Sequence, residues 1–330
     1  QLEAEKLAAS AESTIKDVFS TLGFALSTDP AKDLPFSSSF SPLGVVIDLS
    51  ASKEGAVVIA PKPSRVESVV KACRGHLDTG RMGLADSKML AGKIRFMRES
   101  HFGRCGAQAL RELHAYECSI KDSRLSKGVR DALEWLCEYL PTAKPRRLEC
   151  LGVAASVTVF SDGACEQEAV TLGGCIFEVG FLPEAFGAEV PDAVLKRWRG
   201  DVRWQVIAQT ELAPVLLACV SWRGRLLGRY ATFWIDQDAA RQGLIRGYSA
   251  NVFSAELIDV ALKLLADIGV FPWFARVPSP SNVADLPSRL MWDELQVLFP
   301  EMKVRELPVG AWSSIGKWGS GVSDHADLRA

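Results

Sequence analysis

Residues 1–22 show the first clear pattern, with hydrophobic side chains recurring at the three- and four-residue spacing of a helix. These positions are Leu7, Ile15, Val18, Phe19 and Leu22. A stretch rich in Ser, Pro and Asp at 27–42 predicts a loop. Two β-branched runs follow, at 43–49 and 56–60, and the glycine-containing turn between them predicts a hairpin.

After Pro61 the pattern becomes helical and remains so for about eighty residues. The predicted helices span 64–73, 85–99, 106–117 and 127–139. Two prolines, at 141 and 145, then interrupt the pattern, and the basic residues Lys144, Arg146 and Arg147 predict a linker. The segment 61–147 is therefore expected to be a small helical domain.

From residue 148 onward, β-branched and aromatic runs alternate with helical periodicity. The predicted strands are 155–161, 170–179, 186–190, 229–235 and 270–277, and the predicted helices are 206–220, 239–245, 253–268 and a short one after Asp285. This order predicts an α/β domain, a mixed five-stranded sheet flanked by helices, over 148–305. The Gly- and Ser-rich residues 306–330 predict a loose tail. With residues 1–60 as an N-terminal unit, the chain has four expected parts.

Composition excludes a disordered polymer or a fibre, because 48% of the 330 residues are hydrophobic and 24% are charged. The net charge of −2 hides an uneven distribution. Residues 61–147 contain 18 Lys+Arg and 10 Asp+Glu, a balance of 18 − 10 = +8, so the remainder carries −10. This basic segment has two readings, a surface for nucleic acid or an ordinary solvated face.

The sequence contains neither an apolar run of the roughly 18 residues that a membrane span needs nor a signal-peptide pattern. The 8 cysteines include no C-x-x-C pair and fit reduced thiols. We therefore expect an intracellular protein, cytoplasmic or nuclear, without a membrane partner. Because the chain starts at Gln1 rather than Met, we expect a fragment or a processed piece.

Four carboxylates stand where the predicted elements change. Asp162 follows the first strand of the α/β domain, and Asp236 follows its fourth strand. Glu211 interrupts an otherwise apolar helix, and Asp285 begins the last one. Converging carboxylates repel one another unless cations lie between them, and hard oxygen ligands suit Mg²⁺. Two such ions about 3.5–4 Å apart promote phosphodiester cleavage.

Each acid also has an ordinary explanation. Asp162 precedes a glycine, as in many turns, and Asp236 or Asp285 could favour a solvated helix N-terminus. Glu211 would lie near a helix start if Thr210 were the cap and a proline followed in the first turn. Their joint arrangement is what favours a metal site.

Several segments resemble, in order, the successive motifs of RNase H-like domains. They are VTVFSDGA (157–164), Gly173-Gly174, QTELA (209–213) and FWIDQ (233–237). The segment 276–289 contains NVADLPSR and is similar to the Asn-x-Ala-Asp-x-x-Ser-Arg ending of retroelement polyproteins, especially tyrosine-recombinase (DIRS-type) retrotransposons. The resemblance implies an RNase H-like fold that cuts the RNA strand of RNA–DNA hybrids. It also implies two Mg²⁺ ions, replaceable by Mn²⁺, held by the catalytic acids Asp162, Glu211, Asp236 and Asp285. Asp238 and Asp259 are reserve candidates.

The first 140 residues resemble the end of a reverse transcriptase. Residues 22–48 are similar to the last palm motifs and the primer-grip hairpin, and residues 90–104 to the thumb. The polymerase Asp-Asp motif, the fingers and most of the palm are absent, so we expect no polymerisation by this chain alone. The missing fingers and palm are an expected partner. The family's mobile histidine is also absent, which implies slow turnover.

An RNA–DNA hybrid or another nucleic-acid duplex is therefore the expected partner. The candidate nucleic-acid-binding residues are Lys93, Arg95, Arg104, Arg241, Arg246 and Asn282. The alternative is a catalytically inactive RNase H-fold module that binds nucleic acid or serves as a scaffold, derived from a decayed or domesticated retroelement.

Overall fold

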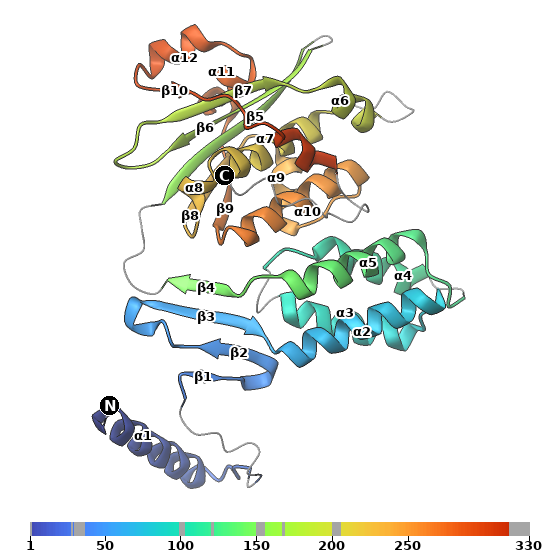
Figure 1. The fold of residues 1–330 in the computed structure, drawn as a ribbon, viewed down its shortest axis with the longest axis vertical. Helices are drawn as coiled ribbons and strands as arrows, with labels where there is room; N and C mark the ends of the chain where they lie inside the picture. The colour runs from blue at the N-terminus through green and yellow to red at the C-terminus, as the bar shows by residue number, and fades with distance from the viewer. Residues whose placement is uncertain are drawn as a thin grey trace.

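The computed structural model describes residues 2–27, 29, 37–98, 103–119, 122–149, 156–166, 169–199 and 206–316. These residues contain two main hydrophobic cores, one among the helices of 63–142 and one around the sheet that begins at Val157. Figure 1 shows the first unit in the lower half of the view and the larger sheet with its helices above it. No helix in the described ranges is both long and apolar enough to cross a membrane.

The N-terminal part has a helix and a small sheet. Helix α1 (Leu2–Thr21) confirms the first prediction, and its apolar positions are exposed. Strands β1 (Ser39–Phe40), β2 (Val45–Asp48) and β3 (Ala56–Pro61) form an antiparallel sheet, so the predicted hairpin is confirmed. Much of the predicted loop at 27–42 lies outside the described residues, and the prediction is wrong at 39–40, where β1 pairs with β2.

The predicted linker after residue 143 is wrong in part, because β4 (Arg146–Glu149) pairs with β3 and completes this sheet. Charged side chains are typical of an exposed edge strand, and here they concealed the strand in the sequence. The sheet therefore joins residues from both ends of the helical unit.

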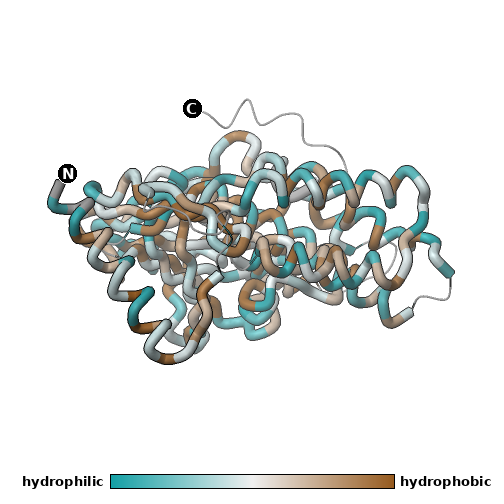
Figure 2. The backbone as a smooth tube through the Cα atoms, turned by 90° about the horizontal axis from the view of Figure 1, so that it is seen from below, coloured by the Kyte–Doolittle hydropathy of each residue, from teal (hydrophilic) through white to brown (hydrophobic). Residues whose placement is uncertain are grey.

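Four helices form the helical unit, close to their predicted positions. They are α2 (Pro63–Thr79), α3 (Leu84–Met97), α4 (Ala107–Ser119) and α5 (Lys127–Thr142). Hydrophilic and hydrophobic positions alternate around these helices, at the right of Figure 2, as amphipathic helices around one core require. Leu90, Leu113, Leu133 and Leu136 are fully buried in that core.

The larger sheet has the strand order β10-β7-β6-β5-β8-β9. Its bounds are β5 (Val157–Glu166), β6 (Ala169–Phe177), β7 (Glu184–Glu189), β8 (Tyr230–Ile235), β9 (Phe271–Arg276) and β10 (Lys303–Val304). Strands β5, β6 and β7 are antiparallel neighbours, whereas β8 and β9 run parallel to β5. The mixed five-stranded sheet implied by the RNase H-like resemblance is therefore confirmed, with the two-residue β10 as an unpredicted addition.

Seven helices accompany this sheet in the described ranges. They are α6 (Asp192–Arg199), α7 (Ile207–Ser221), α8 (Arg223–Leu226), α9 (Asp238–Arg246), α10 (Val252–Asp267), α11 (Asp285–Ser288) and α12 (Trp292–Leu298). Helix α7 is buried almost all round between β5 and α10, which explains its mostly apolar sequence. Helix α6 escaped prediction because its eight residues bury only Leu195 and Trp198.

The expectation of a loose tail from residue 306 is wrong for the described part of that segment. Ala311 begins a short 3₁₀ helix, η5 (Ala311–Gly316), and is completely buried, while Leu307 and Trp312 pack against the same core. Three apolar contacts thus fix a segment whose glycines and serines suggested disorder. Residues 317–330 lie outside the described ranges.

Candidate metal centre

The first carboxylate lies inside a strand rather than after one. Asp162 pairs with Gly173 and Gly163 pairs with Leu172, and β5 continues to Glu166. The predicted strand end at Asp162 is therefore wrong, and so is the alternative explanation of Asp-Gly as a turn. A central strand flanked by β6 and β8 holds the Asp162 backbone rigidly.

Glu211 approaches Asp162 because the helix that carries it lies unusually close to the strand. A Cβ atom at Gly163 would lie 2.6 Å from the carbonyl carbon and oxygen of Thr210, so only glycine fits there. Pro214 lies inside α7, whose N-cap is Val206, and the helix-start explanation of Glu211 is wrong. The acid is a buried side chain of a central helix.

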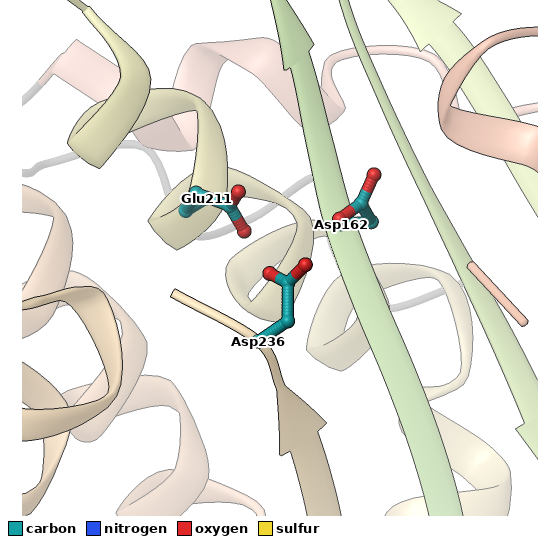
Figure 3. Close-up of side chains that lie close together, drawn as sticks. All are labelled: Asp162, Glu211 and Asp236. Atoms are coloured by element: carbon teal, nitrogen blue, oxygen red, sulfur yellow. The ribbon is translucent and has the colours of Figure 1, made fainter. Parts of the chain in front are cut away.

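Asp236 follows the last residue of β8 as predicted, and β8 lies next to β5. One oxygen each from Asp162, Glu211 and Asp236 lie within 4.8 Å of one another. Figure 3 shows the three side chains converging from a strand, a helix and a strand end. Asp162 and Glu211 are each only 4% exposed.

Burial and the neighbouring charges make Asp162 and Glu211 hard to ionise. Burial raises the pKa of Glu211 to about 9, and the charges of Asp162 and Asp236 add to the effect. Burial also raises the pKa of Asp162 to about 6, although the hydrogen bond from Ser288 opposes this shift. Two buried acids with raised pKa values favour either protonation or a nearby cation.

The residues present fit a divalent cation. Glu211 Oε2 and Asp236 Oδ1 are buried and have no hydrogen-bond partner among the described residues. Buried carboxylate oxygens without partners are costly, and a hard cation satisfies both their charge and their lone pairs. The donor set consists of oxygen only, which suits Mg²⁺ or Mn²⁺.

The fourth predicted acid does not join this group. Asp285 begins α11 as expected, but its Oδ1 accepts a hydrogen bond from Arg289 Nε at 2.9 Å. Arg289 also forms an ion pair with Glu166. Burial and then the charge of Asp236 raise the pKa of Asp285.

The reserve acids lie elsewhere. Asp238 is exposed and paired with Arg241 at 2.8 Å. Asp259 is buried on α10 and is not one of the three grouped acids.

The predicted nucleic-acid-binding residues fall into distinct environments. Arg95, Arg104 and Arg246 are exposed, and Arg95 lies 3.0 Å from His114 Nε2. Arg241 is held by Asp238. The backbone of Arg104 lies next to Gly247, the residue after Arg246, whereas Arg95 contacts His114 and Arg241 contacts Asp238.

Asn282 occupies a different position from the one predicted. Its side chain is 4% exposed and donates hydrogen bonds to Asp162 Oδ1 and to the carbonyl of Ser161. Such a buried amide does not suit direct contact with nucleic acid. The placement instead ties the end motif to the first acid.

Lys93 lines a polar pocket of about 390 Å³ between the small sheet and the helical unit. Its lining residues are Ser41, Gly44, Lys62, Ser64, Arg65, Ser68 and Lys93. Three of them are cations and none is an acid. No ion pair is found for Lys62, Arg65 or Lys93 in the described ranges.

Sequence reasoning missed two features of this region. It overlooked Lys62 and Arg65, although they flank the predicted start of α2. It also gave no role to Ser288, whose hydroxyl lies 2.5 Å from Asp162 Oδ2. The Ser of the Asn-x-Ala-Asp-x-x-Ser-Arg ending was the available signal.

Solved structures similar to this chain include two RNase H proteins. RNase H1 from the archaeon Halobacterium salinarum is 14% identical, with a TM-score of 0.32, covering 42% of this chain and 99% of that one. The N-terminal RNase H domain of a Mycobacterium tuberculosis protein is 12% identical, with a TM-score of 0.30, covering 44% and 99%.

A foamy viral protease-reverse transcriptase in complex with dsDNA is also similar, at 12% identity and a TM-score of 0.29. The match covers 74% of this chain but only 46% of the viral one. No family model and no curated protein matches the chain. The interpretation of the site therefore depends on its own geometry.

Proposed function

We propose that the chain is a metal-dependent nuclease of the RNase H type, which cuts the RNA strand of RNA–DNA hybrids. The observation that supports this most is the group of three carboxylates within 4.8 Å, two of which leave a buried oxygen without a partner. Divalent cations bound there would stabilise the charge that develops as a phosphodiester is cleaved.

The chain's own residues would prepare the site in defined ways. Asp162 would hold the cations from within strand β5, and Asp236 would hold them from the end of β8. Glu211, whose pKa is about 9, would release a proton when a cation binds. Asp285 would complete the set after leaving Arg289, which now holds it.

We propose Lys93 and its pocket as a contact with the phosphate backbone of the duplex. Three cations without an acid in the lining give salt-dependent, sequence-independent affinity. Selectivity for a hybrid would come from duplex shape and the 2′-hydroxyls of one strand.

We also propose that the chain is part of a larger retroelement protein. The hairpin, the helical unit and the end motif together support a reverse transcriptase of a retroelement, of the DIRS type by its last motif. The missing fingers and palm would then be partners of the chain, with residues 61–147 as a thumb-like domain.

The test uses the full chain and an end-labelled RNA–DNA hybrid, with Mg²⁺ or EDTA. We expect Mg²⁺-dependent cleavage that is lost in Asp162→Asn and in Asp236→Asn. Asp293→Asn, an exposed aspartate on α12, is the matched control and should leave cleavage unchanged. No cleavage by the wild type, or equal cleavage by Asp162→Asn, would refute the proposal.

The inactive binding or scaffold module is a second candidate, favoured by one observation. Asp285 is paired with Arg289 and lies outside the group of three acids. Salt-dependent hybrid binding without any Mg²⁺-dependent cleavage would support this candidate over the nuclease.

A further inference from the structure

Both carboxylate oxygens of Asp162 are held from one distant segment. Ser288 Oγ donates to Oδ2 at 2.5 Å, which is shorter than its 2.9 Å contact with the Asp285 carbonyl, and Asn282 Nδ2 donates to Oδ1 at 3.2 Å. Ser288 is completely buried and Asn282 is 4% exposed, so solvent cannot replace either donor easily. Hydrogen bonds from buried donors to an ionised group are the strong kind.

The orientation of the Asn282 amide follows from a second hydrogen bond. Its Oδ1 accepts from the backbone N–H of Ala284 at 3.2 Å. A backbone N–H can only donate, so this atom must be the oxygen, and Nδ2 must face Asp162. The Asn282 side chain therefore bridges the loop before α11 and strand β5.

A row of glycines brings Ser288 within reach. Asp162 pairs with Gly173, and Gly173 pairs with Gly187, so the three lie side by side across β5, β6 and β7. A Cβ atom at Gly173 would overlap the backbone of Pro287 and Ser288, and one at Gly187 would overlap the Pro287 carbonyl. The backbone of residues 287–288 thus packs directly against Gly173 and Gly187, where any side chain would prevent the contact.

We propose that Asn282 and Ser288 are positioning residues that fix the Asp162 carboxylate for cation binding, seated by Gly173 and Gly187. The proposal rests on the nuclease function in that it assigns a cation to Asp162. Each Asp162 oxygen accepts one hydrogen bond from the segment and keeps further lone-pair capacity. The two donors also offset the repulsion from the neighbouring carboxylates of Glu211 and Asp236.

The spacing of the Asn-x-Ala-Asp-x-x-Ser-Arg ending agrees with these positioning roles. Asn282 and Ser288 each stand three residues from Asp285, one on either side, and both turn to Asp162. The ending therefore carries one acid and two donors for a different acid. Removing such supporting donors typically weakens metal binding 10- to 100-fold.

The experiment measures Mg²⁺ binding to the full chain by calorimetry, without nucleic acid. Ser288→Ala and Asn282→Ser should each weaken affinity about 10-fold. Gly173→Ala should have a similar effect, whereas Gly224→Ala, which meets open space on α8, should have none. In a protein that already carries Asp162→Asn, Ser288→Ala should cause no further loss of Mg²⁺ affinity. If Ser288 served only to pack the fold, the second substitution would still lower the affinity.

Circular dichroism identifies any variant that fails to fold. If Ser288→Ala does not fold, the Mg²⁺ affinity of Asn282→Ser tests the inference. Unchanged Mg²⁺ affinity in a folded donor variant would overturn the inference, even if the wild type cleaves hybrids. Weakened affinity together with no wild-type cleavage would retain the inference and refute the nuclease proposal. A wild type that binds no Mg²⁺ would overturn both.

Discussion

Neutralising Glu211 should stabilise the metal-free protein, and the stabilisation should grow with pH. Glu211 has an ordinary pKa of 4.5, which burial raises to about 9 in the folded chain. The folded state therefore binds this proton more tightly than the unfolded state. Stability from the protonated form is fully present below pH 4.5 and is lost as the pH rises to about 9.

The size of the effect follows from that window. A pH of 7.5 lies about three units above the ordinary pKa of Glu211. At about 1.36 kcal/mol per unit, the stability lost by ionising Glu211 at this pH is at most about 4 kcal/mol. Relaxation and water entry reduce such penalties, so we expect Glu211→Gln to raise the free energy of unfolding by about 1–3 kcal/mol. Near pH 5 the same calculation leaves less than about 1 kcal/mol.

Urea unfolding at both pH values, in EDTA, measures this difference. Glu301→Gln is the matched control, because Glu301 is exposed and the substitution is identical. Saturating Mg²⁺ should make the wild type more stable than Glu211→Gln near pH 7.5. At a Mg²⁺ concentration 100 times the dissociation constant, the wild type should gain about 3 kcal/mol in its free energy of unfolding. A Glu211→Gln variant that is equally destabilised at both pH values would refute the reasoning.

Three further outcomes follow from other contacts. Gly163→Ala should cost about 1–3 kcal/mol in thermal unfolding, because its Cβ would meet the α7 backbone at 2.6 Å, whereas Gly224→Ala should not. Glu178→Ala should cost about 3 kcal/mol in urea unfolding, because its 2%-exposed carboxylate pairs with Arg225 and Arg229, and of its ion pairs Arg225 would keep only the longer one with Glu184. Lys62→Ser with Lys93→Ser should weaken hybrid binding and reduce the slope of log affinity against log salt by about 1–2, and an unchanged slope would favour a solvated face.

Strong periodicity made most of the fold predictable. The helices of 63–142 and the five main strands follow patterns that one buried face dictates. The failures share a cause. Strand β4 is an edge strand with basic side chains, and η5 is a six-residue 3₁₀ helix with few apolar side chains, so neither leaves a local pattern.

The site was predictable as a set of residues but not as an arrangement. Sequence order placed Asp162, Glu211 and Asp236 beside the elements that carry them. It could not show that Asp285 is held by Arg289, because an ion pair one helical turn apart depends on side-chain rotamers. Nor could it show that Asn282 faces Asp162, a contact across 120 residues.

The cost of the site bears on the choice between nuclease and inactive module. A chain that only binds nucleic acid gains nothing from a buried carboxylate whose ionisation opposes folding, since glutamine would fill the same space without that penalty. The same chain would gain nothing from glycines that seat a serine against Asp162. Residues that destabilise a fold, such as a buried carboxylate, are typically kept at functional sites, where they are needed for binding or catalysis. If the proposed cation site is correct, the free energy that Glu211→Gln recovers measures how much stability that site costs the fold.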